Sequence, residues 1–97
     1  MDKFEKALAE NIEKAGKLGV NMTRIGASAQ KFGAVKYIKE QIKRDSLGDG
    51  FDQLAKMGRL DLSWQALVIA KEFGDLFEDD EVNYCYMVLL DEGYSLF

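Results

Sequence analysis

Glycine and serine residues divide the middle of the chain, residues 48–77, into short segments with the apolar spacing of helices. The first segment covers residues 51–57. Asp49 or Gly50 can open it, because short polar residues and glycine suit the position before a helix. Gly58 can close it in the left-handed conformation. The chain contains no proline, and this suits short helices joined by glycine turns.

A second helix in this segment is predicted to begin at Ser63. A serine here can accept a hydrogen bond from a free amide of the first turn, and Leu62 and Leu67 occupy the positions of a hydrophobic staple. Trp64, the single tryptophan, begins an apolar stripe that we expect to be buried. The other members of the stripe are Leu67, Val68 and Phe73. Gly74 is expected to end this helix.

Apolar periodicity predicts four further helices, over residues 2–18, 23–32, 34–44 and 78–92. The side chains expected to face inward are Phe4, Ala7 or Leu8, Asn11 or Ile12, Ala15, Leu18, Ile25, Ala29, Phe32, Val35, Ile38, Ile42, Val82, Cys85, Tyr86, Leu89 and Leu90. The last helix starts with four acids, which favour the positive end of a helix dipole. Gly93 and Tyr94 match the C′ and C″ positions of a Schellman motif.

Together these segments predict an all-α protein, a compact single-domain bundle of about five helices with short middle ones. A chain of 97 residues is just large enough for one modest core. We expect residues 1–97 to form one domain, with a core module over residues 21–94. The N-terminal helix, residues 1–19, either packs against this module or docks on another molecule.

The run GRLDLSWQALV, residues 58–68, is followed by FGDLF, a helix and a terminal glycine-tyrosine pair. In this order the segments resemble a small helical module of uncharacterised bacterial proteins. Residues 32–42, FGAVKYIKEQI, resemble the helix that precedes it, and the resemblance covers about residues 21–94. It implies a helical fold and no particular activity. Gln65 departs from the module's glutamate and Glu78 from its serine or threonine cap, so no role for a carboxylate at position 65 is implied.

The chain shows no pattern typical of catalysis, cofactor binding or metal binding. Histidine, the commonest general base and zinc ligand, is absent. Residues 45–56 resemble a calcium loop only superficially, because Leu47 and Lys56 stand where acidic ligands are needed. The acids at residues 78–81 are interpreted as a solvated helix start. We therefore predict that the protein is not an enzyme and has no cofactor or metal.

Three polar or reactive side chains are assigned structural roles. Cys85 is predicted to be a buried thiol, because tyrosines and aliphatic residues surround it in sequence and no base or positive charge activates it. Arg59 and Asp61 are predicted to act locally, Asp61 near the free amides of a helix start and Arg59 on a nearby carboxylate or carbonyl.

The predicted location is the cytoplasm, with no membrane partner. A single cysteine cannot form a disulfide within the monomer, and this indicates a reducing compartment. The N-terminal residues are charged throughout, unlike a signal peptide. No apolar run approaches the roughly 18 residues of a membrane-spanning helix.

Charge is distributed unevenly along the chain. Residues 20–44 contain six basic residues and one acid, whereas residues 45–97 contain three basic residues and twelve acids. The candidate contacts for a partner or for phosphate groups are Arg24, Lys36, Lys39, Lys43 and Arg44. Alternatively, these residues form a solvated face or neutralise the acidic half of the protein.

The sequence favours a small non-enzymatic protein-interaction module, whose partner is another protein or a second copy of the chain. The alternative is an accessory nucleic-acid-binding protein that neutralises phosphates with the basic face of residues 24–44. A third hypothesis, an unrecognised enzyme subunit or regulator, has no catalytic group of residues to support it.

Overall fold

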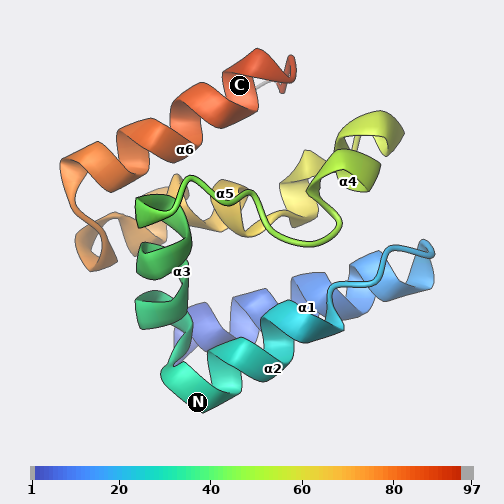
Figure 1. Cartoon of the computed structure of the whole chain (residues 1–97), viewed down its shortest axis with the longest axis horizontal. Coiled ribbons are helices and arrows are strands. Elements are labelled where there is room, and N and C mark those ends of the chain that lie inside the picture. The colour runs from blue at the N-terminus through green and yellow to red at the C-terminus, as the bar shows by residue number, and fades with distance from the viewer. Residues whose placement is uncertain (1, 95–97) are drawn as a thin grey trace.

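The computed structural model describes residues 2–94, and every regular element within them is a helix (Figure 1). In chain order the elements are α1 Lys3–Lys17, α2 Thr23–Phe32, α3 Ala34–Lys43, α4 Phe51–Met57, the 3₁₀ helix η1 Leu60–Leu62, α5 Trp64–Val68, the 3₁₀ helix η2 Lys71–Leu76, and α6 Asp79–Asp91. The predicted all-α class is confirmed, and the middle helices are short.

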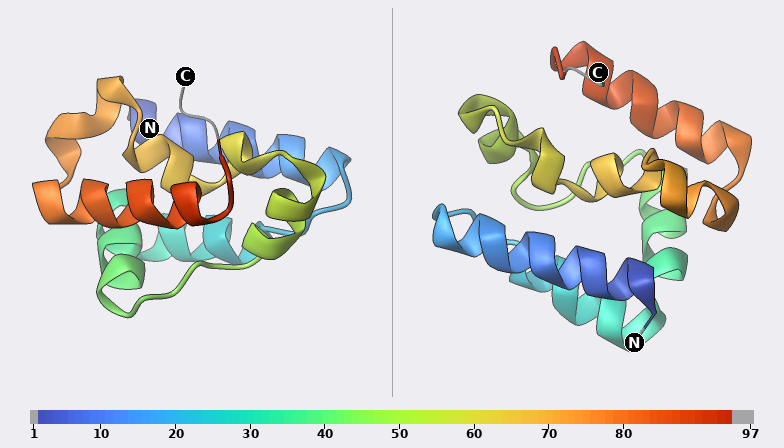
Figure 2. Two further views of the ribbon diagram at one scale, coloured as in Figure 1. Left: turned by 90° about the horizontal axis from the view of Figure 1, so that it is seen from above. Right: turned by 180° about the vertical axis from the view of Figure 1, so that it is seen from behind.

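The helices form three tiers, which Figures 1 and 2 show from several sides. α1 and α2 lie side by side as one outer tier, and α6 forms the opposite edge. The segment from α4 to η2 runs between them, while α3 crosses from the first tier to α6. The molecule is nearly isometric, with extents of 28 × 27 × 24 Å.

The core lies where the middle tier meets α1 and α6. Trp64 is 1% exposed at the start of α5. Phe4 of α1 packs edge-on against Phe73, with the ring centroids 5.2 Å apart, and its ring lies 5.5 Å from that of Phe77. Aromatic pairs at such distances are stabilised beyond their burial of apolar area. The N-terminal helix therefore contributes to the core of this fold.

Residues with positive φ follow five of the helices. They are Gly19 after α1, Gly33 after α2, Asp45 after α3, Gly58 after α4 and Gly93 after α6. At Gly93 the amides of Gly93 and Tyr94 donate to the carbonyls of Leu90 and Leu89, at 2.9 and 3.0 Å, which is the Schellman pattern. The predicted ends at Gly58 and Gly93 are confirmed.

The helix starts at Gly50, Ser63 and Glu78 are the predicted ones. Ser63 Oγ accepts a hydrogen bond from the amide of Ala66 at 3.3 Å. The amide of Glu78 donates to Glu81 Oε1 at 2.8 Å, so a glutamate three residues on partly replaces the usual serine or threonine cap. No side chain caps α4, which follows Gly50 in a left-handed conformation.

The loop between α3 and α4 is held against the core by two side chains. Gln65 is fully buried, and its Nε2 donates to the carbonyl of Leu47 at 2.9 Å. An ionised glutamate at position 65 would have no proton to donate to this carbonyl, so the side-chain amide of glutamine suits the position better. Tyr84 of α6 donates its hydroxyl to Asp45 Oδ1 at 2.6 Å. Burial, followed by this hydrogen bond, raises the pKa of Tyr84.

The helix that begins at Ser63 is shorter than predicted, and the expected stop at Gly74 is wrong. α5 ends at Val68, Ala70 is extended, and Gly74 lies inside η2. Phe73 is nevertheless buried. On one continuous helix, Phe73 would lie nine residues after Trp64 and point in the opposite direction. The break lets both side chains enter the same core.

Four side chains predicted to face inward are exposed instead: Leu18, Phe32, Tyr86 and Leu90. Leu18 and Phe32 lie at helix ends, where the chain turns away at Gly19 and Gly33 and breaks the helical spacing. Tyr86 and Leu90 lie on α6, an edge helix that buries only one face.

Candidate partner surfaces on helices α3 and α6

The five predicted basic residues do not form one free surface. Three have an acidic partner within the fold: Arg24 with Asp49 at 3.6 Å, Lys39 with Glu81 at 2.8 Å, and Arg44 with Glu40 at 3.1 Å. Lys36 and Lys43 are exposed, and neither forms an ion pair with any acid among residues 2–94. Of these five residues, therefore, only two positions of α3 carry a positive charge without an acidic partner in the described part of the chain.

Lys39 connects α3 to the start of α6. Its Nζ contacts Glu81 Oε1, the oxygen that also accepts from the amide of Glu78, and lies 5.5 Å from the centre of the Phe77 ring. Burial acts to raise the pKa of Glu81, but the hydrogen bonds from Lys39 and Glu78 outweigh it and the pKa is lowered. Lys39 thus links the basic segment, residues 20–44, to the acidic segment, residues 45–97.

Replacing Lys39 should destabilise the fold more than replacing its exposed neighbours. Lys39→Ala breaks a partly buried charged hydrogen bond, and we expect a loss of about 1 kcal/mol in the free energy of unfolding. Lys36→Ala and Lys43→Ala should change it by less than about 0.5 kcal/mol. Urea titration at pH 7 compares the three.

The pH dependence of this effect follows from the lowered pKa of Glu81. A carboxylate with a lowered folded pKa stabilises above its unfolded pKa, and this stability is lost as pH falls through the folded value. The difference between Lys39→Ala and the wild type should therefore shrink in acid. Equal stability of Lys39→Ala and Lys36→Ala at pH 7 would contradict the structural role.

A groove on the outer side of α2 and α3 combines an aromatic ring with charge. It has a volume of about 390 Å³, and its lining residues are Phe32, Lys36, Tyr37, Glu40, Gln41 and Arg44. Phe32 is 54% exposed, and Lys31 Nζ lies 5.2 Å from the centre of its ring. Glu40 keeps a negative charge within the groove beside Arg44. The groove therefore attracts an anion less than its basic residues alone suggest.

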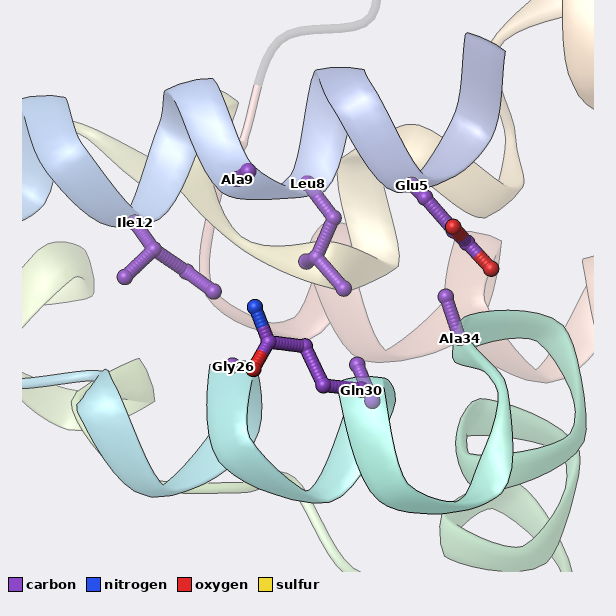
Figure 3. A pocket seen from close by; sticks show the side chains of 8 residues that line it. Glu5, Leu8, Ala9, Ile12, Gly26, Gln30 and Ala34 are labelled. Carbon is purple, nitrogen blue, oxygen red and sulfur yellow. The ribbon is translucent and has the colours of Figure 1, made fainter. Parts of the chain in front are cut away.

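A small cavity lies between α1 and α2 (Figure 3). Leu8 and Ile12 of α1 and Gly26 of α2 line it, and the amide of Gln30 points toward α1 at its edge. Its volume is about 80 Å³, well below the roughly 300 Å³ of typical ligand pockets. The cavity is therefore a packing gap between two helices and not a candidate ligand site.

Among the described residues, the outward face of α6 carries three exposed apolar side chains, Tyr86, Met87 and Leu90, preceded on the same face by the polar Asn83. Asn83, Tyr86, Met87 and Leu90 are all exposed, and they follow one another at i, i+3, i+4 and i+7. This spacing places them on one side of the helix. Cys85 and Leu89 are fully buried on the other side. We call these four exposed residues the α6 stripe.

The α6 stripe was missed in the sequence because Tyr86 and Leu90 were assigned to the core. One signal was present: residues 84–90 are apolar at every position. An edge helix buries only one face, so a helix that is apolar all round leaves an apolar surface in solvent. The sequence alone does not say that this helix lies at the edge.

Acidic residues surround the α6 stripe. Asp79 and Asp80 stand one turn before Asn83, and Asp91 stands one turn after Met87. All three are exposed. Residues 72–94 contain eight acids and no basic residue. The stripe is therefore an apolar surface with negative charge at both ends.

Arg59 pairs with a nearby carboxylate, as predicted, and that carboxylate is Asp61, which was instead expected near the free amides of a helix start. Arg59 Nε and Nη2 donate to the two carboxylate oxygens of Asp61 at 3.0 and 3.2 Å. The hydrogen bond and the charge of Asp61 raise the pKa of Arg59. The two-residue spacing lets the two side chains satisfy each other locally.

Cys85 is fully buried, as predicted, and should react slowly with thiol reagents. Burial, followed by the negative charge of Glu81, raises the pKa of the Cys85 thiol to about 12. The reactive thiolate is therefore scarce at pH 8, and the sulfur is covered. We expect labelling by an aromatic disulfide reagent to require denaturant. Rapid labelling of the native protein would contradict this, and a model thiol provides the reference rate.

The chain matches no protein-family model, no curated protein and no solved structure. Membership of the bacterial helical module therefore stays a prediction. Within residues 2–94, every helix is too short or too polar to cross a lipid bilayer.

Proposed function

We propose that the protein is a non-enzymatic interaction module that binds another protein through the α6 stripe. The observation that carries this proposal is the exposure of Tyr86, Met87 and Leu90 at helical spacing on one edge helix. Clustered apolar side chains in solvent, rimmed by polar residues, are typical of protein-binding surfaces. Aromatic residues and methionine are also enriched at such surfaces.

Other exposed apolar residues support the choice of α6 by contrast. Phe32, Met57 and Leu76 are also exposed, but they lie on α2, α4 and η2, and the exposed Leu18 follows the end of α1. Single apolar residues at the surface are normal and imply no partner. Only α6 presents several of them along one continuous face among the described helices.

The nucleic-acid alternative is supported by Lys36, Lys43 and the exposed ring of Phe32, since bases stack on aromatic side chains while lysines neutralise phosphates. Three of the five predicted contacts are already paired with acids. A true phosphate site should lose affinity steeply with salt, and Lys36→Gln or Lys43→Gln should each reduce the log–log slope by about one. We expect only weak, sequence-blind binding at about 0.15 M salt.

Affinity capture from extracts of the native host tests the proposed function. The Met87→Ser/Leu90→Ser variant removes apolar contacts from the α6 stripe without touching the core. Met57→Ser is the matched control, because Met57 is 46% exposed on α4 whereas Met87 is 51% exposed on α6. Partners recovered with the wild type and with the control should be lost with the α6 variant. Recovery of the same proteins with all three would refute the proposed surface.

A further inference from the structure

We infer that the occupant of the α6 stripe is an amphipathic helix of a partner protein, with basic residues at both ends of its apolar face. This inference rests on the proposed function. The stripe has the i, i+3, i+4, i+7 spacing that helices use to pack along one another, with the polar Asn83 at the first position and apolar side chains at the other three. The stripe extends about 10 Å from Asn83 to Leu90, and the span that includes its flanking acids, Asp79 to Asp91, is about 18 Å, at roughly 1.5 Å per residue. A partner helix of about four turns, or about 15 residues, covers this span and leaves room for charged residues at its ends.

Charge defines the partner further. Asp79 and Asp80 lie at one end of the stripe and Asp91 at the other. Residues 72–94 contain no base, although lysines of α3 share a surface hollow with Asp80 and offset part of its charge. Complementary charges at the edge of an interface steer association and reject like-charged partners. Lysines or arginines flanking the apolar anchors therefore suit this face, and acidic helices do not. Because acids occupy both ends, the partner helix can run in either direction.

A second copy of the chain fits the stripe poorly. If two α6 helices paired in antiparallel fashion, Asp79 and Asp80 of one copy would face Asp91 of the other. Parallel pairing would place the acidic starts together. The basic groove at α2 and α3 of another copy offers one exposed ring, Phe32, and Glu40 lies within this groove, so it matches the three apolar side chains and the acids of the stripe poorly. The partner is thus a different chain.

Two synthetic peptides of about 15 residues test the inference. One has leucines at i, i+3, i+4 and i+7 with lysines at both ends, and the other replaces every lysine with glutamate. Fluorescence anisotropy against the full-length protein should show binding of the basic peptide, with affinity that falls as salt rises. The acidic peptide should bind at least roughly tenfold more weakly.

Variants on α6 locate the binding site. Met87→Lys should lower the affinity for the basic peptide by roughly tenfold or more, because it places a charge in the centre of the apolar face. Asp80→Lys/Asp91→Lys should reverse the preference and favour the acidic peptide. The control Glu10→Lys/Asp52→Lys changes net charge equally on exposed residues of α1 and α4, and it should keep the wild-type preference. Circular dichroism establishes that each variant is folded.

Other outcomes overturn the inference in distinguishable ways. Binding of both peptides with equal affinity would show that the acids of α6 do not select the partner. Self-association in sedimentation velocity that Met87→Lys abolishes would make a second copy the occupant. Failure of both peptides, while affinity capture still depends on Met87 and Leu90, would reject the helical partner but keep the proposed function. If capture does not depend on α6, both proposals fail.

Discussion

Trp64→Ala should lower the free energy of unfolding by about 3–5 kcal/mol, the range for removing a buried aromatic side chain. Trp64 is 1% exposed and lies in the middle tier, between α1 and α6. The loss leaves a large cavity that the surrounding helices cannot fill completely. A domain of this size has a total stability of about 5–15 kcal/mol, so the variant should be close to unfolding at 37 °C. Urea denaturation followed by circular dichroism measures the change.

Phe32→Ala is the matched control for this effect. Phe32 is also aromatic, but it is half exposed at the end of α2. Its replacement should change the free energy of unfolding by less than about 1 kcal/mol, because little buried area is lost. A small effect of Trp64→Ala, similar to that of Phe32→Ala, would contradict the central position of Trp64 in the core.

Local chemistry made the fold class predictable. Ser63 caps α5 with its own hydroxyl, and Gly58 and Gly93 end their helices by adopting a conformation that other residues avoid. Such signals act within a few residues of the chain, so they can be read from the sequence. The same is true of the Arg59–Asp61 pair, whose members are two residues apart.

Features that depend on distant parts of the chain were not predictable in this way. Lys39 and Glu81 are 42 residues apart, and only the crossing of α3 onto α6 brings them together. The exposure of Tyr86 and Leu90 likewise depends on the edge position of α6. The sequence therefore indicated the basic residues of α3 as the candidate site, whereas the structure indicates the exposed face of α6.

The burial of Phe73 was predicted correctly, but the continuous helix from Trp64 to Phe73 was not. A helix turns by about 100° per residue, so residues nine apart point in opposite directions. Trp64 and Phe73 could not share one buried stripe of a straight helix. The observed break at Ala70 resolves this conflict, but no glycine or proline stands at that position to mark it.

Gly48→Ala should be the second most damaging of these changes, with an expected loss of about 2–5 kcal/mol. Gly48 has a φ of +86°, and a Cβ atom at this position would lie 2.8 Å from Trp64 Nε1. Left-handed backbone costs a residue with a side chain about 1–2 kcal/mol. Crowding against a packed core adds about 1–3 kcal/mol. The Trp64 ring is rigid and buried, so it cannot move aside easily.

Gly58→Ala separates the two contributions to this loss. Gly58 is also left-handed, with a φ of +69°, but nothing lies within 4 Å of the position that its Cβ would take. We expect this control to lose only the backbone term, about 1–2 kcal/mol. Chemical denaturation of both variants gives the crowding term as their difference. Equal losses would mean that the loop moves away from Trp64 at no cost.

The contact between Gly48 and Trp64 can then be tested directly by a double-mutant cycle. Trp64→Phe removes the Nε1 atom that the new Cβ meets at 2.8 Å, and it keeps most of the buried ring. In that background, Gly48→Ala should lose roughly 1 kcal/mol less than in the wild type, a coupling typical of residues in contact. Additive losses would show that backbone strain alone accounts for the loss of stability in Gly48→Ala. The contact between the α3–α4 loop and Trp64 would then contribute nothing to that loss.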